Sequence, residues 1–163
     1  MSSCSNSSET YTLYEAEVQR VASGHSLEVT LPQIDPARIQ QVRLIGIDAP
    51  NPAQEPWGPA ARQFLEAQLE RPEAGGKARI QLEVDLQQQD QYGRLLAYAW
   101  HGDQLLNEAV VSSGQALASS RLPNIRYEER LQRAQETARL RGLGLWDPNN
   151  PMRQTPAEFR KTL

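Results

Sequence analysis

Hydrophobic and polar residues alternate in five short segments within the first two thirds of the chain. In the fourth segment, for example, Ile80, Leu82 and Val84 fall on one face and polar residues on the other, which is the period of a half-buried β-strand. The pattern predicts strands at residues 14–21, 26–31, 39–47, 79–86 and 94–100. Turn residues at 23–24 join the first two strands, and those at 90–93 join the last two into a hairpin.

Three longer segments instead repeat their hydrophobic residues at helical spacing. They are residues 57–69, 104–113 and 124–142. Asp103 and Asn124 are suited to cap the second and third helices, and Gly114 and Gly142 are suited to end them. The polar, proline-containing end of the chain predicts a tail that lies over the domain, with a short helix from Ala157.

This order of elements predicts an α+β fold. One helix falls between the third and fourth strands and two follow the fifth, which does not match the regular β-α alternation of a doubly wound sheet. The natural closure for five short strands is an OB-type β-barrel, here with three helices. The 163 residues fit one domain: we expect a disordered tail at residues 1–10, the domain at 11–146 and a C-terminal tail at 147–163.

The composition is that of a soluble globular protein, with 39% hydrophobic and 23% charged residues. No apolar run approaches the ~18 residues of a membrane span. The single cysteine, Cys4, excludes an internal disulfide and a multi-cysteine zinc site. We expect a monomer without a signal peptide, in a compartment that the sequence leaves unknown. Cys4 followed by Ser and Asn also resembles the start of a mature lipoprotein, so export and lipidation stay open if a signal was removed.

The charge gives a mixed indication about nucleic acid. The net charge is -3, whereas dedicated nucleic-acid binders are usually basic. All basic residues except Lys77 and Lys161 are arginine, the side chain whose planar fork suits bidentate contacts with phosphate or carboxylate. The negative net charge therefore argues against a dedicated nucleic-acid binder. The predominance of arginine instead favours contacts with single phosphate or carboxylate groups.

Two short motifs contain the residues best suited to chemistry. In VRLIGIDAP (residues 42–50), Arg43 lies on a strand and Asp48 lies where that strand ends; in DQYGR (residues 90–94), Arg94 directly follows a turn. Two arginines near an aspartate would grip phosphate oxygens, with the carboxylate holding a metal or orienting an arginine. A structural salt bridge next to a turn is the alternative reading of the same residues.

These motifs resemble, in order and spacing, the staphylococcal nuclease (thermonuclease-like) family. The matching segments are VQRVASGHSL at 18–27, VRLIGIDAP at 42–50, PWGPAA at 56–61, DQYGR at 90–94, LAY at 96–98, LNE at 106–108 and GLW at 144–146. The resemblance implies an OB-type barrel with three helices. It also implies calcium-dependent hydrolysis of DNA and RNA phosphodiesters.

The site implied by the family is only partly present in this chain. The resemblance implies a site in which two aspartates hold calcium, a glutamate activates water and two arginines stabilise the phosphate in the transition state. Arg43 and Arg94 match the arginines, and Asp48 matches one aspartate. His25 stands where the other metal carboxylate belongs, and Asn51 stands where the glutamate belongs. We therefore expect calcium binding to be impaired, because calcium prefers oxygen ligands.

The substitutions predict weak or absent hydrolysis, since the loss of a general base alone costs about 10²–10⁴ in rate. Two alternatives would keep an enzyme. Glu55 could replace the missing carboxylate, or His25 could be the base, oriented by Asp48, in a metal-independent reaction.

The expected partners are single-stranded nucleic acid or a nucleotide. The resemblance implies that Tyr92 and Tyr127 flank the nucleotide. The main alternative to a nuclease is a non-catalytic OB-fold module that binds nucleic acid, a nucleotide or a protein partner. A phosphate binder loses affinity steeply with salt, whereas a protein-binding module need not.

Overall fold

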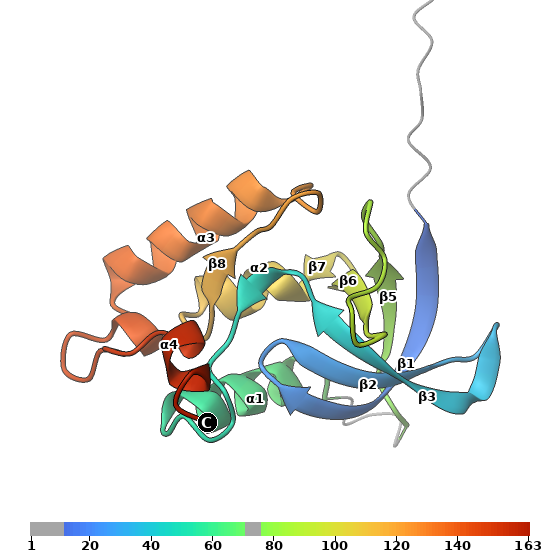
Figure 1. Ribbon diagram of the computed structural model, residues 1–163, viewed down its shortest axis with the longest axis horizontal. Helices are drawn as coiled ribbons and strands as arrows, with labels where there is room; N and C mark the ends of the chain where they lie inside the picture. Colours follow the sequence, from blue (N-terminus) through green and yellow to red (C-terminus); the bar gives the residue numbers. More distant parts are fainter. Residues whose placement is uncertain (1–11, 71–75) are drawn as a thin grey trace, which may run out of the picture.

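The computed structural model describes residues 12–70 and 76–163 and has an α+β architecture (Figure 1). Cys4 and the predicted N-terminal tail lie outside the described residues. The strands are β1 Leu13–Ser23, β2 Ser26–Leu31, β3 Asp35–Leu44, β4 Gly46–Asp48, β5 Arg79–Glu83, β6 Leu95–His101, β7 Gln104–Leu105 and β8 Leu117–Ser119. The helices are α1 Trp57–Gln68, α2 Leu106–Ser112, α3 Glu128–Arg141, the 3₁₀ helix η1 Gly144–Trp146 and α4 Pro156–Arg160.

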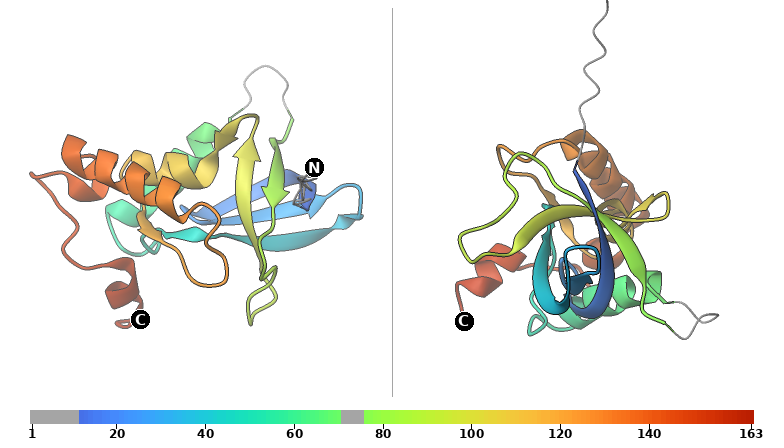
Figure 2. Two further views of the ribbon diagram at one scale, coloured as in Figure 1. Left: turned by 90° about the horizontal axis from the view of Figure 1, so that it is seen from above. Right: turned by 90° about the vertical axis from the view of Figure 1, so that its right-hand side faces the viewer.

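Six of the strands form one strongly curved sheet in the order β3-β2-β1-β5-β6-β7 (Figure 2). All neighbours in this order are antiparallel, and β3 also pairs with β6 in parallel. The two short strands β4 and β8 form a second sheet. This arrangement agrees with the predicted OB-like fold and confirms the β5–β6 hairpin.

The core follows from the alternation seen in the sequence. Buried side chains from alternate positions of the strands meet the apolar faces of the helices, in agreement with the two periods of 2 and 3.6 residues. The largest fully buried side chains in the described residues are Tyr98, Leu27, Leu44, Ile47, Leu65, Leu82, Leu105, Leu106, Leu131, Val29, Val42 and Val110. Figure 1 shows α1, α2 and α3 gathered on one side of the sheet. Within residues 12–70 and 76–163, no helix has the length and apolarity needed to cross a membrane.

The prediction of one continuous strand at residues 39–47 is wrong, because the strand breaks before Gly46. Gly46 has φ of 79°, and a Cβ there would lie only 2.5 Å from the Leu131 Cδ1 atom. Both facts favour glycine, which alone adopts positive φ without steric cost. The chain turns here and continues as β4, which pairs with β8. The break moves Asp48 onto the second sheet.

The predicted starts of two helices are also wrong. Gln104 and Leu105 pair with β6 as strand β7, so the second helix begins at Leu106 and Asp103 is not its cap. The third helix begins at Glu128 rather than at Asn124. Its predicted end is confirmed, because Gly142 takes the left-handed conformation that ends many helices.

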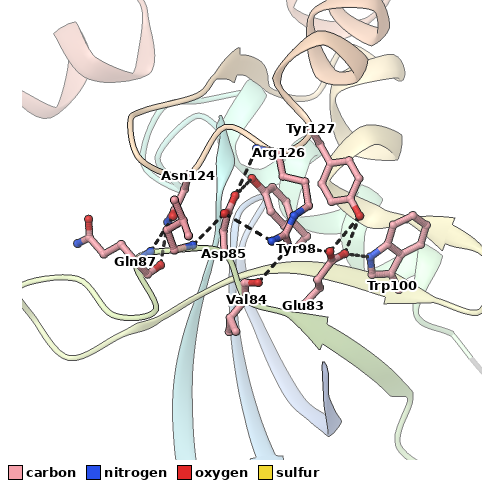
Figure 3. Close-up of polar contacts among 10 residues, drawn as sticks. Glu83, Val84, Asp85, Gln87, Tyr98, Trp100, Asn124, Arg126 and Tyr127 are labelled. Atoms are coloured by element: carbon pink, nitrogen blue, oxygen red, sulfur yellow. Dashed lines mark hydrogen bonds and ion pairs between the residues drawn. The ribbon is translucent and has the colours of Figure 1, made fainter. Parts of the chain in front are cut away.

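Asn124 fails as a cap because its side chain has another partner (Figure 3). Its Oδ1 atom accepts from the main-chain N–H of Gln87 at 2.9 Å, and its Nδ2 atom donates to the carbonyl of Gln87 at 2.8 Å. The segment before α3 is thereby tied to the chain after β5. A side-chain amide that satisfies both main-chain groups of a distant residue competes directly with helix capping.

Next to the Asn124–Gln87 hydrogen bonds, the buried carboxylate of Glu83 joins β5 to the start of α3. Glu83 accepts hydrogen bonds from Tyr127 Oη at 2.7 Å, from Trp100 Nε1 at 2.8 Å and from Arg126 at 2.8 Å (Figure 3). Asp85 accepts from Tyr98 Oη at 2.9 Å in the same network. Buried carboxylates need such partners to offset the loss of water. The network therefore fixes the loop that follows β8 against the sheet.

Candidate functional site

A cavity of about 450 Å³ opens where the end of β3, the strand β4 and the chain before β6 meet. It is lined by His25, Arg43, Ile45, Gly46, Ile47, Asp48, Gln87, Asp90, Arg94, Leu96, Ser119, Arg121, Leu122, Asn124 and Arg160. Four of these side chains are arginines and two are aspartates. The lining thus has an excess of positive charge, although the whole chain is acidic.

The parallel pairing of β3 with β6 brings the two predicted arginines to the cavity. Val42 lies opposite Leu95 and Arg43 lies opposite Leu96. Arg94 comes one residue before β6, so both arginines reach the same end of the paired strands. Arg43 and Arg94, which lie far apart in the sequence, therefore meet because of one strand register.

Arg43 is held by carbonyl oxygens of its own strand end. Its Nη1 atom donates to the carbonyl of Leu44, and its Nη2 atom donates to the carbonyl of Ile47 at 2.9 Å. The Arg43 Nη2 atom is 4.0 Å from Asp48 Oδ1. Burial lowers the pKa of Arg43 to about 10 against the opposing effect of Asp48. The guanidinium therefore stays charged at neutral pH.

Arg94 is oriented by an aspartate in its own turn. Its Nε atom donates to Asp90 Oδ2 at 2.6 Å, while Asp90 Oδ1 accepts the main-chain N–H groups of Tyr92 and Arg94, both at 2.9 Å. Burial raises the pKa of Asp90, and these hydrogen bonds outweigh it, so the pKa lies below its usual value. The ionised Asp90 holds both the turn and the Arg94 side chain in place.

The turn between β1 and β2 places His25 against the strand that holds Arg43. The carbonyl of His25 accepts the N–H of Leu44 at 2.8 Å. Gly24 packs so closely that a Cβ there would lie 2.8 Å from the Ala61 Cβ atom and 2.9 Å from the Ala49 Cβ atom. Contacts below 3.0 Å require the surrounding atoms to move, so the close approach depends on glycine.

The imidazole of His25 is neutral and has no free lone pair. Its Nδ1 atom accepts the main-chain N–H of Ala49 at 2.8 Å, which leaves the ring proton on Nε2. Burial and the nearby charge of Arg43 lower its pKa well below 6.5. Nδ1 is also 3.9 Å from Asp48 Oδ1, but a neutral ring whose Nδ1 is an acceptor forms no ion pair. This arrangement does not favour His25 as a proton acceptor.

Asp48 has a partner that the sequence analysis did not identify. Arg160, at the end of α4, donates from Nη1 to Asp48 Oδ1 at 2.9 Å and from Nη2 to Oδ2 at 3.1 Å. The Asp48 side chain is only 13% exposed. A bidentate guanidinium pair of this kind is short and directional. The carboxylate that the sequence analysis predicted as a metal ligand is therefore engaged by an arginine.

The residues present do not fit a calcium ion. Calcium takes about six to eight oxygen ligands, several of them carboxylates. Asp48 is paired with Arg160, Asp90 is paired with Arg94, and the acceptor nitrogen of His25 is engaged by Ala49. In the described part of the chain, no group of three or more His, Cys, Asp or Glu side chains is arranged to hold a metal.

The other two candidate positions, Asn51 and Glu55, do not line this cavity. The Asn51 side chain accepts the N–H of Ala53 at 2.8 Å and is not among the residues that line the cavity. Glu55 is exposed and lines a separate cavity, together with Trp57 and Phe159. The structure thus brings His25, Arg43, Asp48 and Arg94 together and leaves Asn51 and Glu55 outside the group.

The two tyrosines have different surroundings. Tyr92 is 76% exposed at the tip of the turn that holds Arg94, whose guanidinium carbon lies 5.9 Å from the tyrosine ring centroid. Tyr127 is partly buried, donates to Glu83 and packs edge-to-face on Tyr98 at 4.6 Å between centroids. Only Tyr92 has a side chain that is largely free to meet a ligand.

Sequence reasoning missed Arg121 and Arg160 at the cavity. Arg121 belongs to the loop after β8, a strand that had no clear hydrophobic alternation. Thr155 and Glu158 form a reciprocal capping box at the start of α4, and that sequence pattern could have located the helix. Nothing local could have shown that this helix docks beside Asp48, because the contact joins residues 112 positions apart.

Comparison with known proteins places these features in a family. The family model described as "Staphylococcal nuclease homologue" matches residues 41–148. The thermonuclease of Staphylococcus intermedius is 33% identical over 135 residues, which are 80% of this chain and 74% of that protein. The thermonuclease of Staphylococcus hyicus is 35% identical over 112 residues, 66% of this chain and 63% of that protein. The SPbeta prophage-derived endonuclease YokF of Bacillus subtilis is 26% identical, over 84% of this chain and 45% of its own length.

Proposed function

The chain belongs to the staphylococcal nuclease family, and from this premise we propose that its arginine-lined cavity binds the phosphate groups of nucleic acid with weak or absent calcium-dependent hydrolysis. The relatives are named as nucleases, so single-stranded nucleic acid or a nucleotide is the ligand class proposed here. The proposal concerns a monomer whose domain at residues 11–146 supplies most of the cavity, with residues 147–163 as a C-terminal tail that adds Arg160 to its lining.

The single observation behind the proposal is the way the charges are distributed in the cavity. Arg43 and Arg94, which the sequence resemblance identifies as a phosphate-binding pair, both line the cavity, and each is fixed by hydrogen bonds of its own. Asp48 is the one carboxylate retained from the family's acidic set, and Arg160 occupies it. Such a site has donors for phosphate oxygens, but its carboxylates are paired with arginines and the acceptor nitrogen of His25 is engaged.

The expected rate follows from what is missing. A general base contributes about 10²–10⁴ in rate, and a metal that polarises the phosphoryl oxygen contributes several kcal/mol more. Glu55 lies at another cavity, and the acceptor atom of His25 is occupied. A cleavage rate several orders of magnitude below that of an intact family member is the expected result.

Cleavage of a quenched fluorescent single-stranded DNA tests this proposal, measured with calcium, with manganese and with EDTA. The Arg43→Ala/Arg94→Ala double variant, purified in the same way, is the control for a contaminating nuclease. Calcium-dependent cutting at a rate typical of the family, lost in the double variant, would overturn the proposal of impaired hydrolysis. Cutting that survives EDTA and is lost in His25→Asn would instead support His25 as a base.

Binding of a labelled single strand in EDTA tests the other half of the proposal. We expect the affinity to fall steeply between 50 mM and 200 mM salt, as for any ligand held through phosphates. The double variant should bind at least tenfold more weakly. Affinity that is absent, or that is unaffected by salt and by the two substitutions, would favour the alternative of a protein-binding module.

A further inference from the structure

The C-terminal helix α4 contributes one of the four guanidinium groups that line the cavity. Arg160 reaches Asp48 with two N–H groups, at 2.9 and 3.1 Å, and lines the same cavity as Arg43 and Arg94. The segment matched by the family model ends at residue 148. Arg160 is therefore a feature of this chain beyond the matched domain.

Several contacts fix α4 in this position. Thr155 and Glu158 form the capping box, and Pro156 is buried. The carbonyl of Gln154 accepts from the Nε2 atom of the buried Gln54 at 2.7 Å, just before α1. Because the helix is anchored at its first turn, its last residue, Arg160, reaches Asp48 at a defined place.

The pair also changes the charge that a phosphate would meet. An unpaired Asp48 carboxylate would repel an anion next to Arg43, which is the reason a cation is needed there. The Asp48 carboxylate raises the pKa of Arg160 through its hydrogen bonds, so the guanidinium is charged. Two of its N–H groups bind Asp48, and the remaining N–H groups of a guanidinium can bind an oxygen anion.

We propose that Arg160 takes the place of a metal cation beside Asp48 and makes the cavity a metal-independent site for a terminal phosphate. The lining arginines Arg43, Arg94, Arg121 and Arg160 face the aspartates Asp48 and Asp90, and His25 is neutral. This leaves two unbalanced positive charges. A terminal phosphomonoester has a charge of about -1.5 to -2 at pH 7 and matches them, whereas an internal phosphodiester has one negative charge.

This inference rests on the proposed function, because it assumes that Arg43 and Arg94 bind phosphate. The test compares two labelled oligodeoxythymidines of one length, one with a 5′-phosphate and one with a 5′-hydroxyl, by anisotropy in EDTA. We expect the phosphorylated strand to bind about tenfold more tightly, in line with one added charge-assisted contact. Arg160→Gln should remove most of that difference, and Arg160→Lys should keep part of it.

Arg153→Gln is the matched control, since Arg153 lies in the same C-terminal segment but lines the separate cavity beside Glu55. It should bind both strands like the unaltered protein. Equal thermal unfolding midpoints and circular dichroism spectra would show that the Arg160 variants are folded. If Arg160→Gln does not fold, Arg160→Lys and Asp48→Asn supply the comparison, because each alters the pair while keeping side-chain volume.

The outcomes separate the inference from the proposed function. Binding of neither strand, or binding unaffected by Arg43→Ala/Arg94→Ala, would overturn both. Binding of both strands that depends on Arg43 and Arg94, with no preference for the phosphate, would overturn the inference alone. A tighter affinity of folded Arg160→Gln for the phosphorylated strand would also overturn it, since Arg160 would then cover the site rather than bind there.

Discussion

The main-chain N–H of Ala49 donates to the Nδ1 atom of His25 at 2.8 Å. This hydrogen bond joins the β1–β2 turn to the residue that follows β4. It requires the imidazole to be neutral, because a protonated ring has no acceptor at Nδ1. The substituted residue is therefore part of the local structure around Asp48 and Ala49.

The free energy of unfolding should decrease with acidification through the titration of His25. Its pKa is near 6.5 in the unfolded chain and well below that value in the folded protein. Between the two values the unfolded chain binds more protons, so stability is complete above about pH 6.5 and falls below it. The slope from this group is up to about 1.4 kcal/mol per pH unit. Urea unfolding at a series of pH values from 5 to 8 measures it.

His25→Asn provides the comparison for this pH dependence. The amide oxygen of Asn can still accept the N–H of Ala49, but the side chain does not titrate. The variant should lose most of the slope between pH 5 and 6.5. His101→Asn removes the other histidine, which does not line the cavity, and controls for the loss of a histidine as such. An unchanged slope in His25→Asn would show that the histidine is not held neutral.

The buried side chain of Asn107 should contribute substantially to the free energy of unfolding. Asn107 is fully buried; its Oδ1 atom accepts the N–H of Ala99 at 2.9 Å, and its Nδ2 atom donates to the carbonyl of Ile45 at 2.7 Å. Asn107→Ala leaves both main-chain groups without partners and should reduce the free energy of unfolding by about 2–4 kcal/mol. Urea unfolding tests this value, and a loss below 0.5 kcal/mol would contradict it.

Asn107 lies within the LNE segment, yet its role could not be predicted from the residues alone. The pattern places it on the second helix, but which main-chain groups it meets depends on how β6 and the end of β3 pack against α2. The same limit applies to Asp48. Its position after a strand was predictable, whereas the close packing of Leu131 against Gly46 and the pairing of β4 with β8 involve residues far away in the sequence.

The candidate site divides in the same way between local and long-range information. Arg43 and Arg94 were identifiable because each sits in a short motif with its own turn or strand end. Their meeting follows from the β3–β6 register, which an OB-type fold supplies. Arg160 was not identifiable, because a five-residue helix gives no signal of where it docks. The local patterns predict elements, and only packing determines which distant side chains share a cavity.

Calcium should not stabilise the unaltered protein, whereas a designed variant should respond to it. The Nδ1 atom of His25 lies 3.9 Å from Asp48 Oδ1, so His25→Asp places a second carboxylate next to the first, and Arg160→Gln frees Asp48. Two adjacent carboxylates favour a cation strongly. The double variant should gain a calcium-dependent rise in unfolding midpoint, about 2.7 kcal/mol of stabilisation at a concentration 100 times Kd.

Differential scanning fluorimetry with calcium and with EDTA measures this response. His25→Asn/Arg160→Gln is the matched control, because it has the same shape without the added charge. It should show no calcium-dependent shift. A rise in the midpoint of the unaltered protein on adding calcium would contradict the reading that Arg160 stands in place of the metal.

The two tyrosines expected to flank a nucleotide should respond differently to substitution. Tyr92 is exposed beside Arg94, so Tyr92→Ala should weaken binding of a single strand by at least about fivefold, since stacking of one base on an aromatic ring contributes about 1–3 kcal/mol. The free energy of unfolding of Tyr92→Ala should change little.

Tyr127 donates to the buried carboxylate of Glu83. Tyr127→Phe removes that donor but keeps the ring, so it should lower the free energy of unfolding by about 1–3 kcal/mol and leave single-strand affinity unchanged. Anisotropy and urea unfolding of both variants separate the roles, and weaker binding by a stable Tyr127→Phe would place Tyr127 at the nucleotide instead.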